Sequence, residues 1–209
     1  MLIKSIKGYF ENIILDLDQI DSERKKLLSD FAKFMEEKKA RGETINLVFI
    51  CTHNSRRSQM GQILAQSAAE YFGIKKISCY SGGTETTAFN IRAVNALVRA
   101  GFETKNADTS ENPVYSVKYS NEANPIECFS KIYTDPINPE QNFAAILTCS
   151  DADAACPVVS GAEIRFPIRY EDPKIFDNTE LEEQMYDKRC RQIASEMIYA
   201  FSLINNSNK

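Results

Sequence analysis

Segments with the pattern of buried strands alternate with amphipathic segments along this 209-residue chain, and that alternation constrains its fold more than any other feature. Apolar runs of strand length lie at residues 45–50, 74–80, 143–148 and 164–168. Apolar residues at helical spacing lie at 58–72, 90–100 and 179–203. The alternation predicts an α/β fold, in which a four-stranded parallel sheet carries helices on both faces. Residues just past the carboxyl ends of such strands share one rim, where α/β proteins place their sites.

The first 44 residues lie outside this alternation, and we expect an N-terminal helical extension (1–44) followed by an α/β domain (45–209). Asp21 and Ser22 are candidate N-caps, and Gly42 is a candidate helix stop. Between them, one stripe of apolar residues recurs at helical spacing: Leu27, Leu28, Phe31, Phe34 and Met35. The stripe must cover either the chain's own core or a second subunit, so a homodimer is one of two alternatives.

Residues 102–142 show no clear periodicity and are rich in Asn, Pro, Ser and Glu. Four prolines exclude a long helix there: Pro113, Pro125, Pro136 and Pro139. We expect an irregular insertion with a functional or mobile character, containing one short strand at 114–119.

Composition narrows the class of protein. The net charge of -4 gives no reason to expect nucleic acid or an anionic membrane as partner. No run approaches the ~18 apolar residues of a membrane span, and the first residues lack the pattern of a secretion signal. We therefore expect a cytoplasmic protein, in which the six cysteines are mostly reduced.

The segment between the first predicted strand and the next predicted helix carries reactive residues. It reads Cys51-Thr52-His53-Asn54-Ser55-Arg56-Arg57-Ser58. Backbone N–H groups of such a turn and the positive end of the helix dipole converge on one spot, which suits phosphate, arsenate or sulfate. The same field favours a thiolate at Cys51, and Arg57 offers a planar fork for two anion oxygens. Ser58 either hydrogen-bonds the sulfur or caps the helix.

The alternative for this segment is a buried structural cysteine beside a solvated arginine, since free cysteines are usually small core residues. The cysteine, the arginine and the serine, together at a strand-to-helix turn, favour the nucleophile.

Cys149 and Cys156 lie seven residues apart after the third predicted strand. Two helical turns separate such positions, about 10 Å, whereas a disulfide needs Cα atoms within about 7 Å. A regular helix between them must therefore unwind before they can pair, which is the behaviour of a switch. Two unrelated core cysteines are an equally weighted alternative, and Cys79 and Cys190 are expected to be core residues of this kind.

Asp172-Pro173 follows the fourth predicted strand, where the carboxyl group could reach the rim and protonate a leaving oxygen. Asp-Pro also forms turns readily, which is the simpler explanation of the pair. His53, the single histidine, either assists the thiolate or is an exposed side chain within the loop.

Several of these motifs together resemble the low-molecular-weight tyrosine phosphatase superfamily, whose fold is flavodoxin-like. They are the loop at 51–60, Ser81-Gly82-Gly83 after the second predicted strand, and Asp172-Pro173. Within that superfamily, Thr148-Cys149-Ser150-Asp151-Ala152-Asp153-Ala154-Ala155-Cys156-Pro157 resembles the redox segment of thioredoxin-coupled arsenate reductases. The resemblance covers residues 45–100 and 143–204.

The resemblance implies a role for each matching position. Cys51 attacks arsenate while Arg57 and the amides of the loop (Thr52, His53, Asn54, Ser55, Arg56) hold its oxygens. Asp172 protonates the departing oxygen. Cys149 then attacks Cys51, arsenite leaves, and Cys156 moves the disulfide to a segment that thioredoxin or a similar reductant can reach. Asn54 is expected to stiffen the loop.

The resemblance implies no tightly bound cofactor, but it suggests a potassium ion near Asn54 and Ser81. Gln62 stands where an acidic ligand of that ion is expected. Arg56 occupies the place of a second loop cysteine, where it either adds positive charge beside the anion or points into solvent.

Two other functions stay open from the sequence. A phosphatase acting on phosphotyrosine or a small phosphoester needs only Cys51, Arg57 and Asp172. Tyr170 lies near the acid, where an aromatic ring could stack on a phenyl group, although Lys174 follows the Asp-Pro pair. A non-catalytic anion or redox sensor is the third hypothesis, which a complete set of catalytic residues disfavours.

Overall fold

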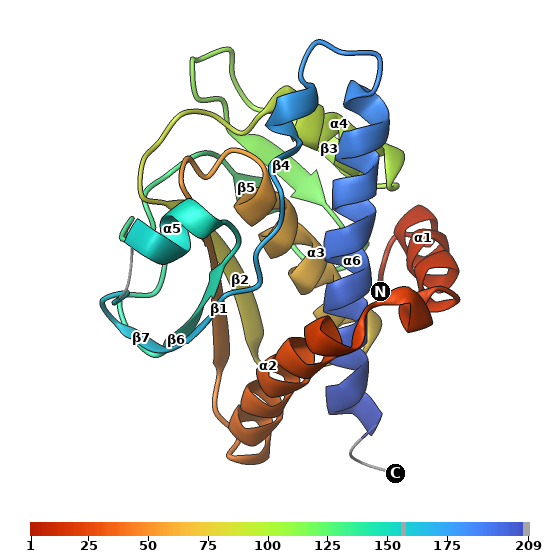
Figure 1. Cartoon of the computed structure of the whole chain (residues 1–209), viewed down its shortest axis with the longest axis vertical. Helices are drawn as coiled ribbons and strands as arrows, with labels where there is room; N and C mark the ends of the chain where they lie inside the picture. The colour runs from red at the N-terminus through yellow and green to blue at the C-terminus, as the bar shows by residue number, and fades with distance from the viewer. Residues whose placement is uncertain (156–157, 207–209) are drawn as a thin grey trace.

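A four-stranded parallel sheet with the order β2-β1-β6-β7 forms the centre of the computed structural model, which describes residues 1–155 and 158–206 (Figure 1). Its strands are β1 (Ile45–Cys51), β2 (Ile77–Gly83), β6 (Phe143–Leu147) and β7 (Ala162–Phe166). The predicted parallel sheet is therefore confirmed. The second strand begins three residues later than expected, because Gly73 and Lys76 adopt positive φ and turn the chain before it.

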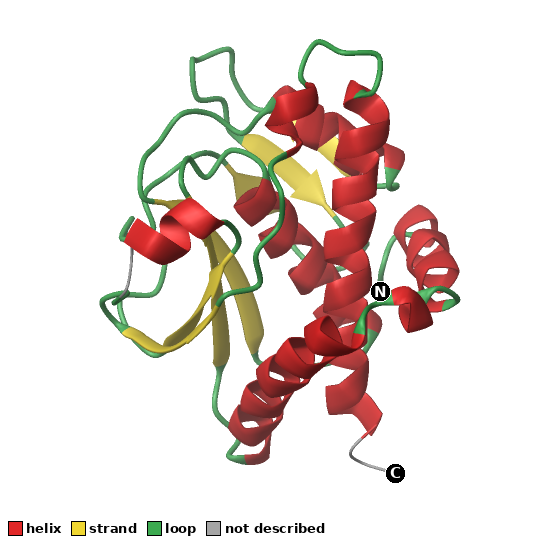
Figure 2. Ribbon diagram, viewed as in Figure 1, coloured by secondary structure: helices red, strands yellow, loops and turns green. Residues whose placement is uncertain are grey.

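Helices cover both faces of the sheet, but very unequally (Figure 2). One face packs against the long helices α3 (Arg57–Tyr71) and α2 (Ser22–Ala40), and α6 (Glu182–Asn206) packs against both of these helices. The other face is covered by α5 (Ser150–Ala155), a helix of six residues. Side chains of β1 point alternately to the two faces of the sheet, and a hydrophobic core lies on each face. Leu47 and Phe49 enter the larger core, and Val48 and Ile50 enter the smaller one.

The N-terminal extension consists of α1 (Lys4–Ile14), a 3-10 turn η1 (Leu17–Gln19) and α2. Asp21 is the N-cap of α2, because its side chain accepts a hydrogen bond from the backbone N–H of Arg24. Leu28, Phe31 and Met35 are fully buried, and the Phe31 ring lies 5.2 Å from that of Phe166. The apolar stripe thus covers the chain's own core, which is one of the two alternatives that the sequence leaves open.

The segment 102–142 differs from the irregular structure expected of it. It forms a three-stranded antiparallel sheet from β3 (Glu103–Asn106), β4 (Tyr115–Lys118) and β5 (Ile126–Cys128). The strand expected at 114–119 is confirmed, and the other two were missed because β3 is polar throughout and β5 has only three residues. The helix between β2 and this sheet, α4 (Ile91–Arg99), starts at its predicted cap Asn90.

Backbone hydrogen bonds join the insertion both to the N-terminal extension and to the end of β2. Ile3 donates its backbone N–H to the carbonyl of Tyr119, which joins the extension to the insertion. Gly83 at the end of β2 donates to the carbonyl of Lys131 and accepts from the N–H of Tyr133. Residues 131–133 therefore lie along the carboxyl end of β2, beside the rim of the sheet.

Every helix within the described ranges is too short or too polar to cross a lipid bilayer.

The close contact between Gly82 and the backbone of Tyr133 predicts that a larger residue at position 82 destabilises the protein. A Cβ atom at Gly82 would overlap the backbone of Tyr133, so Gly82→Ala should lower the free energy of unfolding by about 1–3 kcal/mol. Urea denaturation of the purified protein measures this loss. Gly8→Ala is the matched control: Gly8 lies inside α1 with nothing within 4 Å of an added Cβ, so its substitution should stabilise the protein by about 0.5–1 kcal/mol. Equal stabilities of the two variants would contradict this packing argument.

Candidate active site

The turn from β1 into α3 is built to receive an anion. Cys51 is the last residue of β1, and α3 begins at Arg57, one residue earlier than expected. Within residues 1–155 and 158–206, the backbone N–H groups of residues 52–57 find no protein acceptor. Buried backbone donors are rarely left unpaired, so this group of amides at a helix N-terminus suits an oxyanion.

Ser58 contacts the sulfur and does not cap the helix, which decides between its two predicted roles. Its Oγ lies 3.0 Å from Cys51 Sγ, and it accepts a hydrogen bond of 2.8 Å from Asn54 Nδ2. Because Asn54 supplies that hydrogen, the hydroxyl hydrogen of Ser58 is available to the sulfur. This chain of donors favours negative charge on Cys51.

Asn54 holds the turn in shape, as the stiffening role expected of it requires. Its φ of +47° lies in the left-handed region, which Asn tolerates better than most residues. Its side-chain Oδ1 accepts from Gln59 Nε2 at 3.1 Å and from the backbone N–H of Lys131 at 3.0 Å. Gln59 also donates to the carbonyl of Phe129 at 2.8 Å. The insertion therefore braces the loop, and the sequence contained no signal of this contact.

Arg57 and Asp172 meet although 115 positions separate them. Arg57 Nη2 donates to Asp172 Oδ2 at 2.6 Å, and Arg57 Nη1 donates to the carbonyl of Tyr170 at 2.9 Å. The Arg57 Nε is buried without a partner, so it remains available to a bound anion. Asp172 also caps the 3-10 helix η2 (Pro173–Phe176) by accepting from the N–H of Lys174. Its predicted place at the rim and its predicted place in a turn are thus both observed.

Arg56 takes neither of its two expected positions. Its Nε donates to the hydroxyl of Tyr186 at 2.7 Å, and its Nη2 lies 3.2 Å from Asp177 Oδ2. The Asp177 carboxylate balances its charge, so the side chain neither faces the anion nor lies free in solvent. His53 is half exposed and lies 3.4 Å from Glu85, consistent with an exposed loop side chain.

Cys149 lies on the same rim as Cys51. It is fully buried, and its Sγ lies 3.5 Å from Thr52 Oγ1, in the residue that follows Cys51. The N–H of Ala152 in α5 donates to the same sulfur at 3.3 Å. Cys156 lies outside the described residues.

Three further cysteines are core residues. Cys79, Cys128 and Cys190 are buried in the large core, and burial raises the pKa of the Cys128 and Cys190 thiols to about 12. The expectation that Cys79 and Cys190 pack as small apolar residues is confirmed, and none of the three is poised as a thiolate.

The residues near the suggested potassium site do not fit an ion that includes Asn54. Both hydrogen bonds to Asn54 Oδ1 come from N–H donors, which leaves that oxygen little capacity for a cation. Ser81 Oγ and Gln62 Oε1 are buried without a partner, but both are uncharged. The described residues also contain no group of three or more His, Cys, Asp or Glu arranged to hold a metal.

A groove of about 390 Å³ opens beside the loop. Its lining includes His53, Phe89, Ile91, Tyr115 and Lys174. The Tyr170 ring is not part of this groove: it is buried, and the guanidinium of Arg24 covers it at 5.0 Å. Tyr170 therefore cannot stack on a substrate phenyl group in this groove, contrary to what its position in the sequence suggested.

Comparisons with known proteins agree with this geometry. Residues 46–116 match the profile of the low molecular weight phosphotyrosine protein phosphatase family. An arsenate reductase of Staphylococcus aureus is 32% identical over 114 residues, a match that covers 53% of this chain and 65% of that protein. An arsenate reductase of Bacillus licheniformis is 28% identical over 159 residues, which cover 75% of this chain and 94% of that protein.

Solved structures show the same fold. A low molecular weight phosphotyrosine phosphatase from Vibrio cholerae superposes with a TM-score of 0.51 at 15% identity, covering 79% of this chain and 97% of that one. A YwlE mutant from Bacillus subtilis superposes with a TM-score of 0.50 at 14% identity, covering 79% of this chain and all of that one.

The fold is that of a low-molecular-weight phosphatase-like α/β protein, and this chain matches the profile of that family over residues 46–116. In sequence it is similar to the arsenate reductases of the superfamily.

The hydrogen bonds of Asn54 predict a loss of anion binding when they are removed. Asn54→Ala removes one donor and one acceptor and leaves alanine at a positive φ, which should cost about 1–3 kcal/mol of stability. We expect inorganic phosphate to bind about tenfold more weakly, a loss of about 1.4 kcal/mol measured by titration calorimetry.

Asn46→Ala is the control for this prediction, because Asn46 makes one exposed hydrogen bond near the opposite end of β1. Phosphate binding should be unchanged in that variant. An Asn54→Ala protein that binds phosphate as tightly as the wild type would show that the loop does not depend on these hydrogen bonds.

Proposed function

We propose that this protein reduces arsenate to arsenite through Cys51, Cys149 and Cys156. The observation that carries the proposal is the position of Cys149, whose Sγ lies 3.5 Å from Thr52 Oγ1, beside the nucleophile's loop. Phosphoester hydrolysis has no use for a second sulfur at that place, whereas a thiol relay requires one. The similarity to two proteins named arsenate reductases supports the same conclusion.

In the first step, the Cys51 thiolate attacks the arsenic atom of arsenate. The free amides of the loop and Arg57 Nε hold the oxygens of the anion, and Ser58 stabilises the thiolate before it attacks. A protonated Asp172 gives its proton to one arsenate oxygen, which leaves as water. The product is an arsenate group bound to the Cys51 sulfur, with arsenic still pentavalent.

In the second step, the Cys149 thiolate attacks the Cys51 sulfur. A Cys51–Cys149 disulfide forms, the sulfur–arsenic bond breaks, and its electron pair remains on arsenic, which leaves as trivalent arsenite. Two sulfur atoms are thus oxidised by one electron each while arsenic gains two. Because α5 begins directly after Cys149 and its Ala152 N–H donates to that sulfur, we expect the start of the helix to shift as the sulfur attacks.

In the third step, the Cys156 thiolate attacks Cys149 and releases the Cys51 thiolate. A thioredoxin-type dithiol then reduces the Cys149–Cys156 disulfide and restores the starting state. The cycle needs thiols that are kept reduced between turnovers, and we therefore assign the protein to the cytoplasm.

A phosphatase is the second candidate, and the groove beside the loop is the observation that favours it. Its lining includes Phe89, Ile91 and Tyr115, which could contact an organic group attached to a phosphate. The two chemistries share the Cys51 intermediate, and they diverge when either water or Cys149 attacks it.

A coupled assay separates the two functions. Wild-type protein with arsenate, thioredoxin, thioredoxin reductase and NADPH should consume NADPH, and Cys149→Ser should reduce the steady rate at least a hundredfold because arsenite release depends on the second sulfur. Cys190→Ser is the control, since Cys190 lies buried in α6 away from the rim.

The rate of arsenate-dependent NADPH consumption by the wild-type protein decides whether it is a reductase. An absence of arsenate-dependent NADPH consumption in the wild type would exclude the reductase. Hydrolysis of an aryl phosphate at equal rates in the wild type and Cys149→Ser would instead assign the phosphatase function.

The ion pairs of α5 predict how easily Cys149 becomes reactive. Asp153 Oδ1 accepts from Arg165 at 2.7 Å, its Oδ2 accepts from Arg169, and its side chain is mostly buried. Asp153→Asn removes these ion pairs and should make α5 easier to unwind. We expect iodoacetamide to alkylate Cys149 several-fold faster, measured with Cys51→Ser and Cys156→Ser in the background.

Asp151→Asn is the matched control for that experiment, because Asp151 is exposed on the same helix. Its alkylation rate should equal that of the background protein. If Asp153→Asn reacts no faster than this control, the ion pairs do not restrain the helix.

A further inference from the structure

We propose that Arg24, in α2 of the N-terminal extension, is a positioning residue for Asp172, so that the extension is a working part of the active site. The inference rests on the proposed function, in which Asp172 protonates the departing oxygen. It assigns a role to the segment 1–44, which the resemblance to the superfamily does not cover.

Arg24 contacts the chain directly before the acid. Its Nη2 donates to the carbonyl of Arg169 at 3.0 Å, and its guanidinium lies over the ring of Tyr170 at 5.0 Å. These two residues precede Asp172 by three and two positions. The contact therefore fixes where the loop that carries Asp172 leaves the sheet.

The same backbone leads to the anion site. The N–H of Tyr170 donates to the carbonyl of Thr148 at the end of β6, and its own carbonyl accepts from Arg57 Nη1 at 2.9 Å. Arg57 in turn donates to Asp172 at 2.6 Å. A shift of residues 169–170 would thus move the acid that follows them, whereas Arg57 stays with its own helix α3 beside the loop.

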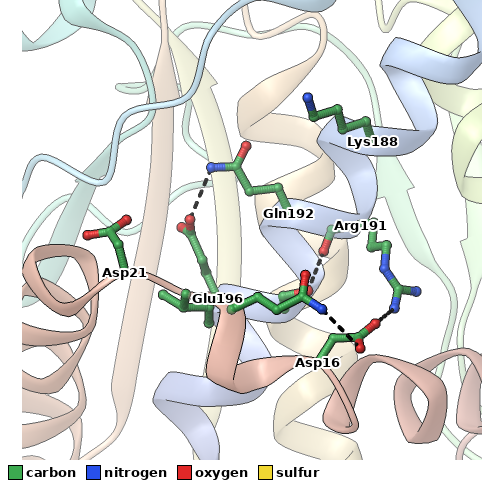
Figure 3. Close-up of a pocket in the computed structure, with 9 residues that line it drawn as sticks. Asp16, Asp21, Lys188, Arg191, Gln192 and Glu196 are labelled. Atoms are coloured by element: carbon green, nitrogen blue, oxygen red, sulfur yellow. Dashed lines mark hydrogen bonds and ion pairs between the residues drawn. The ribbon is translucent and has the colours of Figure 1, made fainter.

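Arg24 is itself held in place by buried groups. Its guanidinium forms an ion pair of 2.7 Å with Glu196 in α6, where only 4% of the glutamate side chain is exposed. Glu196 also accepts a hydrogen bond of 3.2 Å from Gln192 (Figure 3). A buried ion pair fixed at both ends is a rigid support, and removing one partner leaves the other as an unpaired charge.

The extension is fastened to α6 at a second point. Arg191 forms an ion pair of 2.6 Å with Asp16, and its Nη1 donates to Asn12 at 3.0 Å. Figure 3 shows Asp16 and Arg191 across a small pocket of about 270 Å³ from Glu196. The extension therefore binds α6 at Arg24 and again at residues that precede it, and Arg24 reaches from this anchored element to the acid loop.

The geometry has a consequence for the rate. Proton transfer needs the acid within hydrogen-bond distance of the leaving oxygen, and a displacement of about 1 Å can lower a rate by about a hundredfold. Within residues 1–155 and 158–206, the hydrogen bonds of Arg24 involve neither the loop amides nor the Cys51 sulfur. Its loss should therefore lower kcat while leaving KM for the anion nearly unchanged.

A double-mutant cycle tests the inference. Arg24→Met should lower kcat for arsenate about tenfold with less than a twofold change in KM. In an Asp172→Asn background, Arg24→Met should lower kcat no further, because the residue it positions is already absent. Lys26→Met is the control on the same helix, since Lys26 is exposed, and its kcat should match the wild type in both backgrounds.

Folding is controlled separately. Arg24→Met leaves Glu196 buried without a counter-charge, so the cycle is repeated with Arg24→Met and Glu196→Gln made together. Urea denaturation verifies that each variant is folded at the assay temperature. Hydrolysis of phenyl phosphate, whose leaving group also needs a proton, supplies the same cycle if arsenate is not the substrate.

Failure of the acid role of Asp172 and failure of the positioning role of Arg24 give different results. If Asp172→Asn turns over as fast as the wild type, the acid role in the proposed function fails. If Asp172→Asn is slow but Arg24→Met lowers kcat equally in both backgrounds, the acid role stands and the positioning role of Arg24 is overturned. A rise in KM without a fall in kcat would likewise overturn it.

Discussion

The unpaired backbone amides of the turn at 52–57 are the constraint on which the rest of the site depends. A turn with several backbone donors that lack protein acceptors needs support from neighbouring groups, because such donors would otherwise draw the backbone toward other acceptors. Asn54 supplies that support by holding a left-handed backbone while its side chain bonds in three directions. The anion-binding geometry is therefore a property of the surrounding packing as much as of the loop.

The two segments that lie outside the family resemblance both contact residues of the site. The insertion contributes the N–H of Lys131 and the carbonyl of Phe129 to the network around Asn54. The extension contacts the chain that leads to the acid, where Arg24 donates to the backbone carbonyl of Arg169. The two extra segments therefore contact residues that hold the loop and the acid in place.

Local pattern predicted the main elements well, because β1 and β6 are nearly continuous apolar runs and α2 and α4 begin at the predicted caps Asp21 and Asn90. Cys51, Ser58, Arg57 and Asp172 could be brought together from sequence, since strand ends of a parallel sheet share a rim. Arg56 could not be placed, because its direction depends on Tyr186 and Asp177, 130 and 121 positions away. The strands β3 and β5 were missed for a related reason: their stability comes from pairing with β4 and not from their own composition.

The unequal covering of the sheet carries a consequence for the molecule at work. The smaller face rests on α5, and beneath it lie Val48, Ile50, Ala145 and Leu147. In the proposed cycle this short helix must loosen each time a disulfide forms, so every turnover uncovers part of a hydrophobic core to water. The oxidised protein would then expose more apolar surface than the reduced protein and would be less soluble. Rapid reduction would restore the burial of these residues as well as the reactive thiols.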